Sequence, residues 1–206
     1  MAACALVCIA LFDLLAMFFP NRITTNVVVE KFLTQTHYDP RHRDDIDEVD
    51  RLLGVLEGLA TEADDRIYVL AASDTLNSHV LMFAHLSLGR HEAIGGKVMW
   101  THDIDKRDGF PNHLLTAKYL VVADPVQYSF NPDDQRVVGI PAEFVLAQKN
   151  IGTSYERLPY EFSLDQGVKV YIYKKVRPFN DADIAQLSNI FKGFYPDRPK
   201  VYEIKR

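Results

Sequence analysis

Three short runs of apolar, β-forming residues constrain the fold of this chain more than any other feature of its sequence. They are RIYVLAA at 66–72, KVMWT at 97–101 and YLVVA at 119–123. Short apolar runs bounded by turn-forming residues are typical of strands that are buried on both faces. A predicted helix over 75–88 separates the first two runs. This order indicates a parallel sheet with crossover helices.

Amphipathic segments surround these strands. Apolar residues recur every three or four positions over 44–60, which predicts a helix. Asp44, Asp45 and Asp47 lie at its start, where carboxylates suit the helix dipole, so this acidic cluster indicates a helix start and not a metal site. The residues at 136–139 are compatible with a further short strand, and PAEFVLAQ at 141–148 predicts a short helix with proline in its first turn.

The end of the chain predicts a different arrangement. Alternating apolar residues on either side of Asp165-Gln166-Gly167 predict a β-hairpin over 160–175. A helix over 180–191, capped by Asn180 or Asp181, follows the hairpin. The expected fold class is therefore α/β: a small, mostly parallel sheet with crossover helices, plus a C-terminal β-hairpin and a closing helix.

The N-terminal segment is hydrophobic enough to suggest a membrane helix. Residues 2–20 carry Asp13 as their one charge, and about 20 apolar residues are needed to cross a bilayer core. No basic residue precedes Arg22, so a secretory signal is disfavoured. We expect three parts: a last, truncated membrane helix at 1–21, a connector at 22–43 and one soluble α/β domain at 44–206. A helix buried within the domain is the alternative for 1–21.

Charge and cysteine content exclude several classes of function. The chain has 206 residues and a net charge of −5, with no cluster of basic residues, so we expect no nucleic-acid partner. Both cysteines, Cys4 and Cys8, lie in the first ten residues, which leaves the rest without a disulfide framework or a thiol nucleophile. The basic residues that follow the hydrophobic segment would by themselves favour a cytoplasmic location for the domain.

No established catalytic or phosphate-binding motif is present, so the candidate site comes from the expected topology. Ligands of open α/β sheets bind beyond the carboxyl ends of the strands. Polar residues follow the first and third predicted strands, and they form one rim if those strands are neighbours: Ser73, Asp74, Asn77, Asp124 and Gln127. Trp100 or Tyr128 would offer a flat apolar face to such a ligand. The alternative is structural: Ser73 or Asp74 caps the next helix, and Asp124-Pro125 is a turn.

We expect no metal and no cofactor. The loop over 102–113 holds possible ligands, namely His102, Asp103, Asp105, Asp108 and His113, but their spacing fits neither an EF-hand nor a zinc motif. The sequence therefore favours a solvated loop. A separate possibility is an interaction surface on the predicted hairpin, where Tyr171 and Tyr173 would be exposed on one face. The alternative is that these tyrosines are there because tyrosine is a good strand former.

Four stretches resemble a known family. They are RDDID at 43–47, RIYVLAASDTLN at 66–77, YLVVADPVQYSFNPDDQRVVGIPAEF at 119–144 and GVKVYIYKKVRPF at 167–179. Together they are similar to the C-terminal part of bacterial polytopic glycosyltransferases of the GT-C class, relatives of the dolichyl-phosphate-mannose protein mannosyltransferases. In that family the catalytic carboxylates sit in outward-facing loops between the first membrane helices, so no catalytic residue can be placed on this chain.

This resemblance implies an accessory domain at the outer face of the cell membrane, without catalytic acids of its own, that helps to hold a lipid-linked sugar donor or a glycan acceptor. The membrane and that sugar or glycan are the expected partners. A soluble small-molecule enzyme or nucleotide-binding α/β domain is the alternative. It would use Ser73, Asp74, Asn77 and Asp124 of this rim, although the turn after the first strand lacks the glycines that dinucleotide sites need.

Overall fold

The computed structural model describes residues 11, 43–88, 94–198 and 202. The chain divides into two compact units, 1–46 and 47–206. The expected membrane helix at 1–21 and the connector at 22–43 lie outside the described residues, apart from Leu11 and Arg43. Among the residues that are described, no helix is both long and apolar enough to cross a membrane.

The central sheet has four strands and is mixed. They are β1 (Ile67–Leu70), β2 (Tyr119–Asp124), β3 (Tyr155–Ser163) and β4 (Lys169–Lys175), in the order β1-β2-β4-β3. β1 pairs with β2 in parallel, and β4 pairs with β2 and β3 in antiparallel fashion. The prediction of a mostly parallel sheet is therefore wrong. The predicted hairpin is confirmed, but β4 joins the sheet beside β2 and brings two antiparallel pairings with it.

The predicted strand at 97–101 is reduced to a single parallel bridge between Val98 and Ile67. Side chains replace the ladder bonds that a longer strand would make. The Thr101 hydroxyl donates to the Val69 carbonyl at 2.9 Å, and the Thr101 N–H donates to Ser78 Oγ at 3.3 Å. The segment still runs along the free edge of β1, which keeps it next to the residues that follow that strand.

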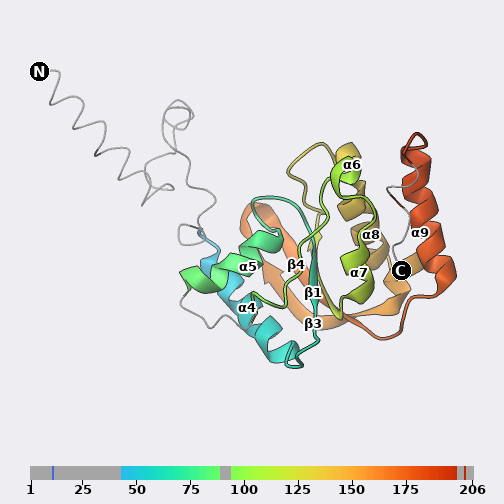
Figure 1. The fold of residues 1–206 in the computed structure, drawn as a ribbon. Coiled ribbons are helices and arrows are strands. Elements are labelled where there is room, and N and C mark those ends of the chain that lie inside the picture. The colour runs from blue at the N-terminus through green and yellow to red at the C-terminus, as the bar shows by residue number, and fades with distance from the viewer. Residues whose placement is uncertain (1–10, 12–42, 89–93, 199–201, 203–206) are drawn as a thin grey trace, which may run out of the picture. The chain divides into compact units, whose positions relative to one another are not determined.

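Helices cover both faces of the sheet (Figure 1). They are α4 (Ile46–Leu59), α5 (Ser78–Ser87), α6 (Asp105–Asp108), α7 (Asn112–Thr116), α8 (Arg136–Leu146) and α9 (Asp181–Phe194). The helices predicted over 44–60, 75–88 and 180–191 are confirmed with shifted ends. The possible strand at 136–139 is wrong, because those residues begin α8 and Pro141 lies inside that helix. Short 3-10 helices η2 (Pro132–Asp134), η3 (Asn150–Ser154) and η4 (Asp165–Gly167) connect these elements.

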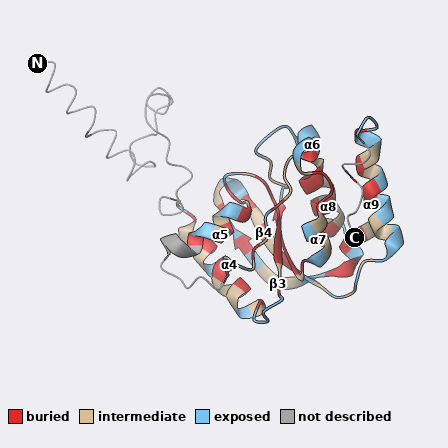
Figure 2. Ribbon diagram, viewed as in Figure 1, coloured by how far each residue is buried: buried red, intermediate tan, exposed pale blue. Residues whose placement is uncertain are grey.

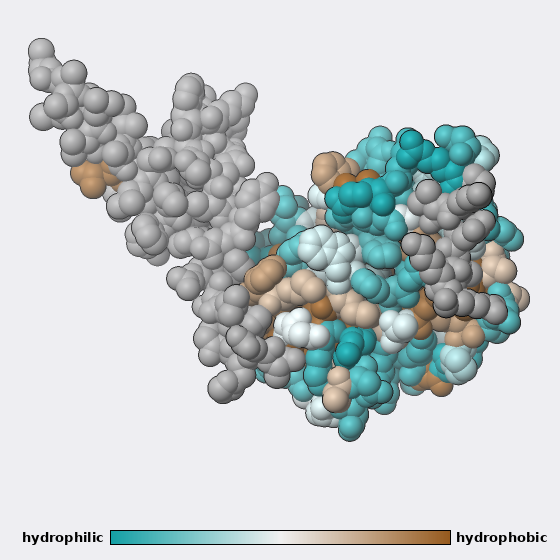
Figure 3. Space-filling view, viewed as in Figure 1, coloured by the Kyte–Doolittle hydropathy of each residue, from teal (hydrophilic) through white to brown (hydrophobic). Residues whose placement is uncertain are grey.

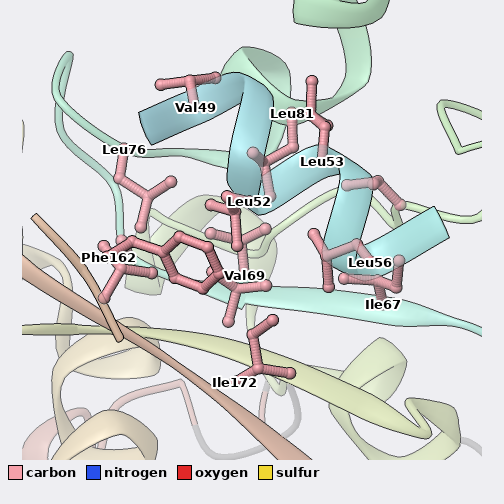
Figure 4. Close-up of a cluster of buried hydrophobic side chains, with 14 of the residues drawn as sticks. Val49, Leu52, Leu53, Leu56, Ile67, Val69, Leu76, Leu81, Phe162 and Ile172 are labelled. Atoms are coloured by element: carbon pink, nitrogen blue, oxygen red, sulfur yellow. The ribbon is translucent and has the colours of Figure 1, made fainter. Parts of the chain in front are cut away.

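The period-two pattern of the strands separates two hydrophobic cores. In β1, Ile67 and Val69 pack toward α4 and α5, whereas Tyr68 and Leu70 pack toward α7, α8 and α9. The buried strands form the centre of the burial pattern in Figure 2. On the α4 side, the side chains of Leu52 and Leu56 reach down to the sheet (Figure 4). Both faces of the central strands are covered, which explains their continuous apolar runs.

The hairpin does not present the exposed tyrosine face that a possible interaction surface there would need. Tyr173 is buried, and Tyr171 is half-buried with the Arg157 guanidinium 3.6 Å from its ring centroid. The residues of β4 alternate as the sequence predicts, but both faces of the strand are covered: Val170 and Ile172 pack in the core beside α4, and Tyr173 packs in the core beside α8. These tyrosines therefore support the second core and do not form an interaction surface.

Candidate functional site

A hollow of about 110 Å³ lies at the carboxyl end of β1, between the β1–α5 loop and the segment that follows Val98. Its lining combines hydroxyl, amide, carboxylate and aromatic groups: Ala71, Ala72, Ser73, Asp74, Asn77, Ser78, His79, Trp100, Thr101, Asp103 and Ser129. A drug-sized ligand usually occupies a pocket of about 300–1,000 Å³. The hollow therefore fits one ring or one polar group of a larger ligand.

Internal hydrogen bonds shape the loop after β1. Ser73 Oγ accepts from the Thr75 N–H at 3.2 Å, and the Asn77 amide donates to the Ser73 carbonyl at 2.8 Å. Asn77 Oδ1 accepts from the Val80 N–H at 2.9 Å, so Asn77 is the N-cap of α5. The alternative that Ser73 or Asp74 caps this helix is therefore wrong. Asp74 is exposed and lines the hollow.

The two strand ends are neighbours, as the predicted rim requires, but only one of them borders the hollow. β1 and β2 pair in parallel, which brings the residues after each strand together. Gln127 Oε1 accepts from Ser73 Oγ at 3.1 Å, and so Gln127 supports the loop without lining the hollow. Asp124 is exposed, precedes a cis peptide bond to Pro125, and also lies outside the lining. Ser73, Asp74 and Asn77 are the rim residues that the hollow brings together.

Aromatic side chains form one wall of the hollow. Trp100 is 49% exposed, and the His79 ring meets it edge-on with centroids 4.4 Å apart. Phe83, one turn further along α5, stacks on His79 at 6.1 Å and is itself exposed. The surface drawn in Figure 3 is mostly hydrophilic with smaller hydrophobic areas. A half-exposed indole beside carboxylates is a suitable platform for the apolar face of a sugar ring, while the polar groups can accept hydrogen bonds from the sugar hydroxyls.

Asp103 contributes the second carboxylate of the hollow. Its side chain pairs with Arg107 and is hydrogen-bonded to Asp108. Burial raises the pKa of Asp103 above its usual value, and the hydrogen bond to the Asp108 carboxyl adds to that rise. Burial also acts to raise the pKa of Asp108, but the Arg107 guanidinium and the Ile104 and Asp103 N–H groups hold it well below its usual range. A carboxyl with a perturbed pKa in a hollow is typical of functional sites.

The loop over 102–113 is not the solvated loop that the sequence favours. Asp105 is fully buried, and its carboxylate accepts from the Val137 N–H at 2.8 Å and from the Tyr195 hydroxyl at 2.7 Å. The described residues contain no group of three or more side chains placed to hold a metal ion. The loop instead bridges β1, α8 and the C-terminal segment.

Sequence reasoning missed Asp103, His79 and Ser129 as lining residues. Asp103 was considered only as a metal ligand, because its relation to the end of β1 depends on the single bridge at Val98. One signal was available: Trp100, the single tryptophan of the chain, lies near the end of the apolar run at 97–101, close to Asp103 in the sequence.

The pH dependence of stability tests whether His102 is buried in the loop over 102–113 as the structure shows. His102 is half-buried with Nδ1 2.9 Å from the Phe110 carbonyl, and burial, with the nearby His113, lowers the pKa of His102 below 6.5. An unfolded chain then binds a proton more readily than the folded one. We expect the free energy of unfolding to fall as the pH falls below about 6.5. Urea denaturation between pH 7.5 and 5 should show a smaller decrease for His102→Gln than for the wild type. An unchanged pH profile in the variant would contradict this assignment.

No family model matches the sequence, and comparisons with curated proteins and with solved structures likewise return no match.

Proposed function

We propose that the folded unit is a non-catalytic accessory domain of a membrane glycosyltransferase, and that it holds the sugar of a lipid-linked donor, or a glycan acceptor, in the hollow after β1. The observation that carries this proposal is the composition of the hollow, in which Asp74 and Asp103 lie around the half-exposed Trp100. The resemblance of four sequence stretches to GT-C glycosyltransferases supports it independently.

The chemistry of the hollow suits a neutral, hydroxyl-rich group such as a sugar ring. Carboxylates accept hydrogen bonds from sugar hydroxyls, and such charge-assisted bonds are stronger than neutral ones. The indole supplies a flat apolar surface at low entropic cost, because a tryptophan has only two rotatable bonds. The bonds of Ser73 and Asn77 within the loop fix its shape before a ligand arrives, which lowers the cost of binding.

A nucleotide is the weaker candidate ligand. The turn after β1 contains Ser73, Asp74 and Thr75 where dinucleotide sites carry glycines that allow the backbone to approach a pyrophosphate. A thermal-shift screen with nucleotides separates the two candidates, because a ligand at a hundredfold excess over its Kd stabilises by about 2.7 kcal/mol.

Calorimetric titration of the full chain tests the proposal. The probe is a short-chain, water-soluble polyprenyl-phosphate mannose, with the free hexose in a parallel titration. We expect Asp103→Asn and Asp74→Asn each to weaken binding roughly tenfold, since a hydrogen bond to a charged group contributes about 1.5–3 kcal/mol.

Asp64→Asn is the matched control, because Asp64 is exposed and precedes β1, whereas the hollow follows it. This control should bind like the wild type. Equal affinity in all three variants would exclude the hollow as the site. Sugar transfer by the chain alone, from the same donor to any acceptor, would refute the non-catalytic assignment.

A further inference from the structure

Two histidines of the loop form a pair outside the proposed sugar site. The rings of His102 and His113 lie with their centroids 5.1 Å apart and their planes tilted by 47°. His102 precedes α6, and His113 lies in α7. Their side chains meet because the loop between them folds back, and not because of helical spacing. The pair is therefore a product of the tertiary structure.

Backbone carbonyls fix the ring nitrogens of both residues. His102 Nδ1 lies 2.9 Å from the Phe110 carbonyl oxygen, and His113 Nδ1 lies 3.0 Å from the Trp100 carbonyl oxygen. A carbonyl can only accept, so Nδ1 carries the proton in each ring. When the ring is neutral, Nε2 therefore holds a lone pair. The lowered pKa of His102 keeps that imidazole neutral at physiological pH.

This arrangement matches the way proteins prepare histidine as a metal ligand. Ligating histidines nearly always donate their other ring N–H to a carbonyl or carboxylate, which sets the tautomer and the ring orientation. Two imidazoles bound through Nε2 to one tetrahedral ion, at metal–nitrogen distances of about 2.0–2.1 Å, have ring centroids about 5 Å apart. The observed separation agrees with that value.

We propose that His102 and His113 bind a divalent transition metal ion through their Nε2 atoms. Imidazole favours zinc, copper and nickel over magnesium and calcium. The exposure of His113 leaves room for water or a further ligand in the remaining coordination positions. The site is separate from the sugar hollow, since neither histidine lines it, and the proposal does not depend on the proposed function.

Copper quenching of tryptophan fluorescence tests this site in the full chain. Trp100 is the single tryptophan, and its carbonyl contacts His113, so Cu²⁺ bound at the pair should quench its emission. We expect saturable quenching by CuCl₂ in the wild type. In His113→Gln and His102→Gln, the affinity should fall roughly tenfold or more, as for other losses around metal sites.

His79→Gln is the control, because His79 touches the Trp100 ring and is the competing nearby ligand. This variant should be quenched like the wild type. Loss of quenching in His79→Gln but not in His113→Gln would overturn the proposal, as would the absence of saturable quenching below millimolar copper. ZnCl₂ should raise the melting temperature of the wild type by more than that of His113→Gln. Because His113 is exposed, its replacement leaves a folded variant even if His102→Gln fails to fold.

Discussion

Gly152→Ala should lower the melting temperature by roughly 10 °C. The added methyl group overpacks the structure, and we expect the free energy of unfolding to fall by about 3 kcal/mol or more. Gly152 lies in η3, which packs directly on the last turn of α8. A methyl group at this position would sit 2.0 Å from the Phe144 carbonyl oxygen and 2.8 Å from Val145 Cα. Both are backbone atoms and cannot rotate away. The Phe144 carbonyl also accepts from the Lys149 N–H at 2.9 Å, so its displacement would break a second contact.

Gly58→Ala is the matched control for this substitution. Gly58 is exposed within α4, and an added methyl group there meets no atom within 4 Å. Replacement of a glycine inside a helix should stabilise the protein by about 0.5–1 kcal/mol. The melting temperatures of the two variants should therefore shift in opposite directions from that of the wild type. A Gly152→Ala variant as stable as the wild type would show that η3 does not pack on α8 as described.

Asp105→Ala should cost about 3 kcal/mol of folding free energy. The Asp105 carboxylate is fully buried, and its removal leaves the Val137 N–H in the first turn of α8 without its acceptor. It also removes the partner of the Tyr195 hydroxyl and a carboxylate 4.0 Å from the Arg136 guanidinium. Loss of one member of a buried charged network leaves the others desolvated and unpaired, which is more costly than the loss of a single bond.

Two further variants separate the parts of this network. Tyr195→Phe removes one hydroxyl and should cost about 1 kcal/mol. Asp134→Ala changes an exposed carboxylate nearby in η2 and should stay within about 0.5 kcal/mol of the wild type. The loss of unfolding free energy in the double variant of Asp105 and Tyr195 should be smaller than the sum of the losses in the two single variants. Equal unfolding midpoints in urea for Asp105→Ala and Asp134→Ala would contradict the buried network.

The sequence predicts local structure well in this chain. The apolar runs over 66–72 and 119–123 become β1 and β2, and the turn at 165–167 joins β3 to β4. These elements are determined by residue alternation and turn chemistry, which are local properties. The mixed sheet could not be predicted in the same way, because nothing in the hairpin sequence specifies that β4 pairs with β2.

The candidate site also combines residues that the sequence predicts with residues that it does not. Ser73, Asp74 and Asn77 were predicted because they follow a strand directly. Asp103 depends on the bridge at Val98, and the buried state of Asp105 depends on α8 and on Tyr195, 90 residues further along the chain. Such long-range contacts leave no periodic signal in the sequence. Asp105 was for that reason assigned to a solvated loop.

The most direct test of the central claim is the indole N–H resonance of Trp100, which is a single signal in the ¹⁵N spectrum because the chain has one tryptophan. It should be followed during titration with the short-chain polyprenyl-phosphate mannose. A ligand in the hollow would contact the half-exposed indole. We predict a saturable shift of this signal, with the donor unchanged at the end of the titration. A signal that stays in place up to millimolar donor, or consumption of the donor by the chain alone, would contradict the account.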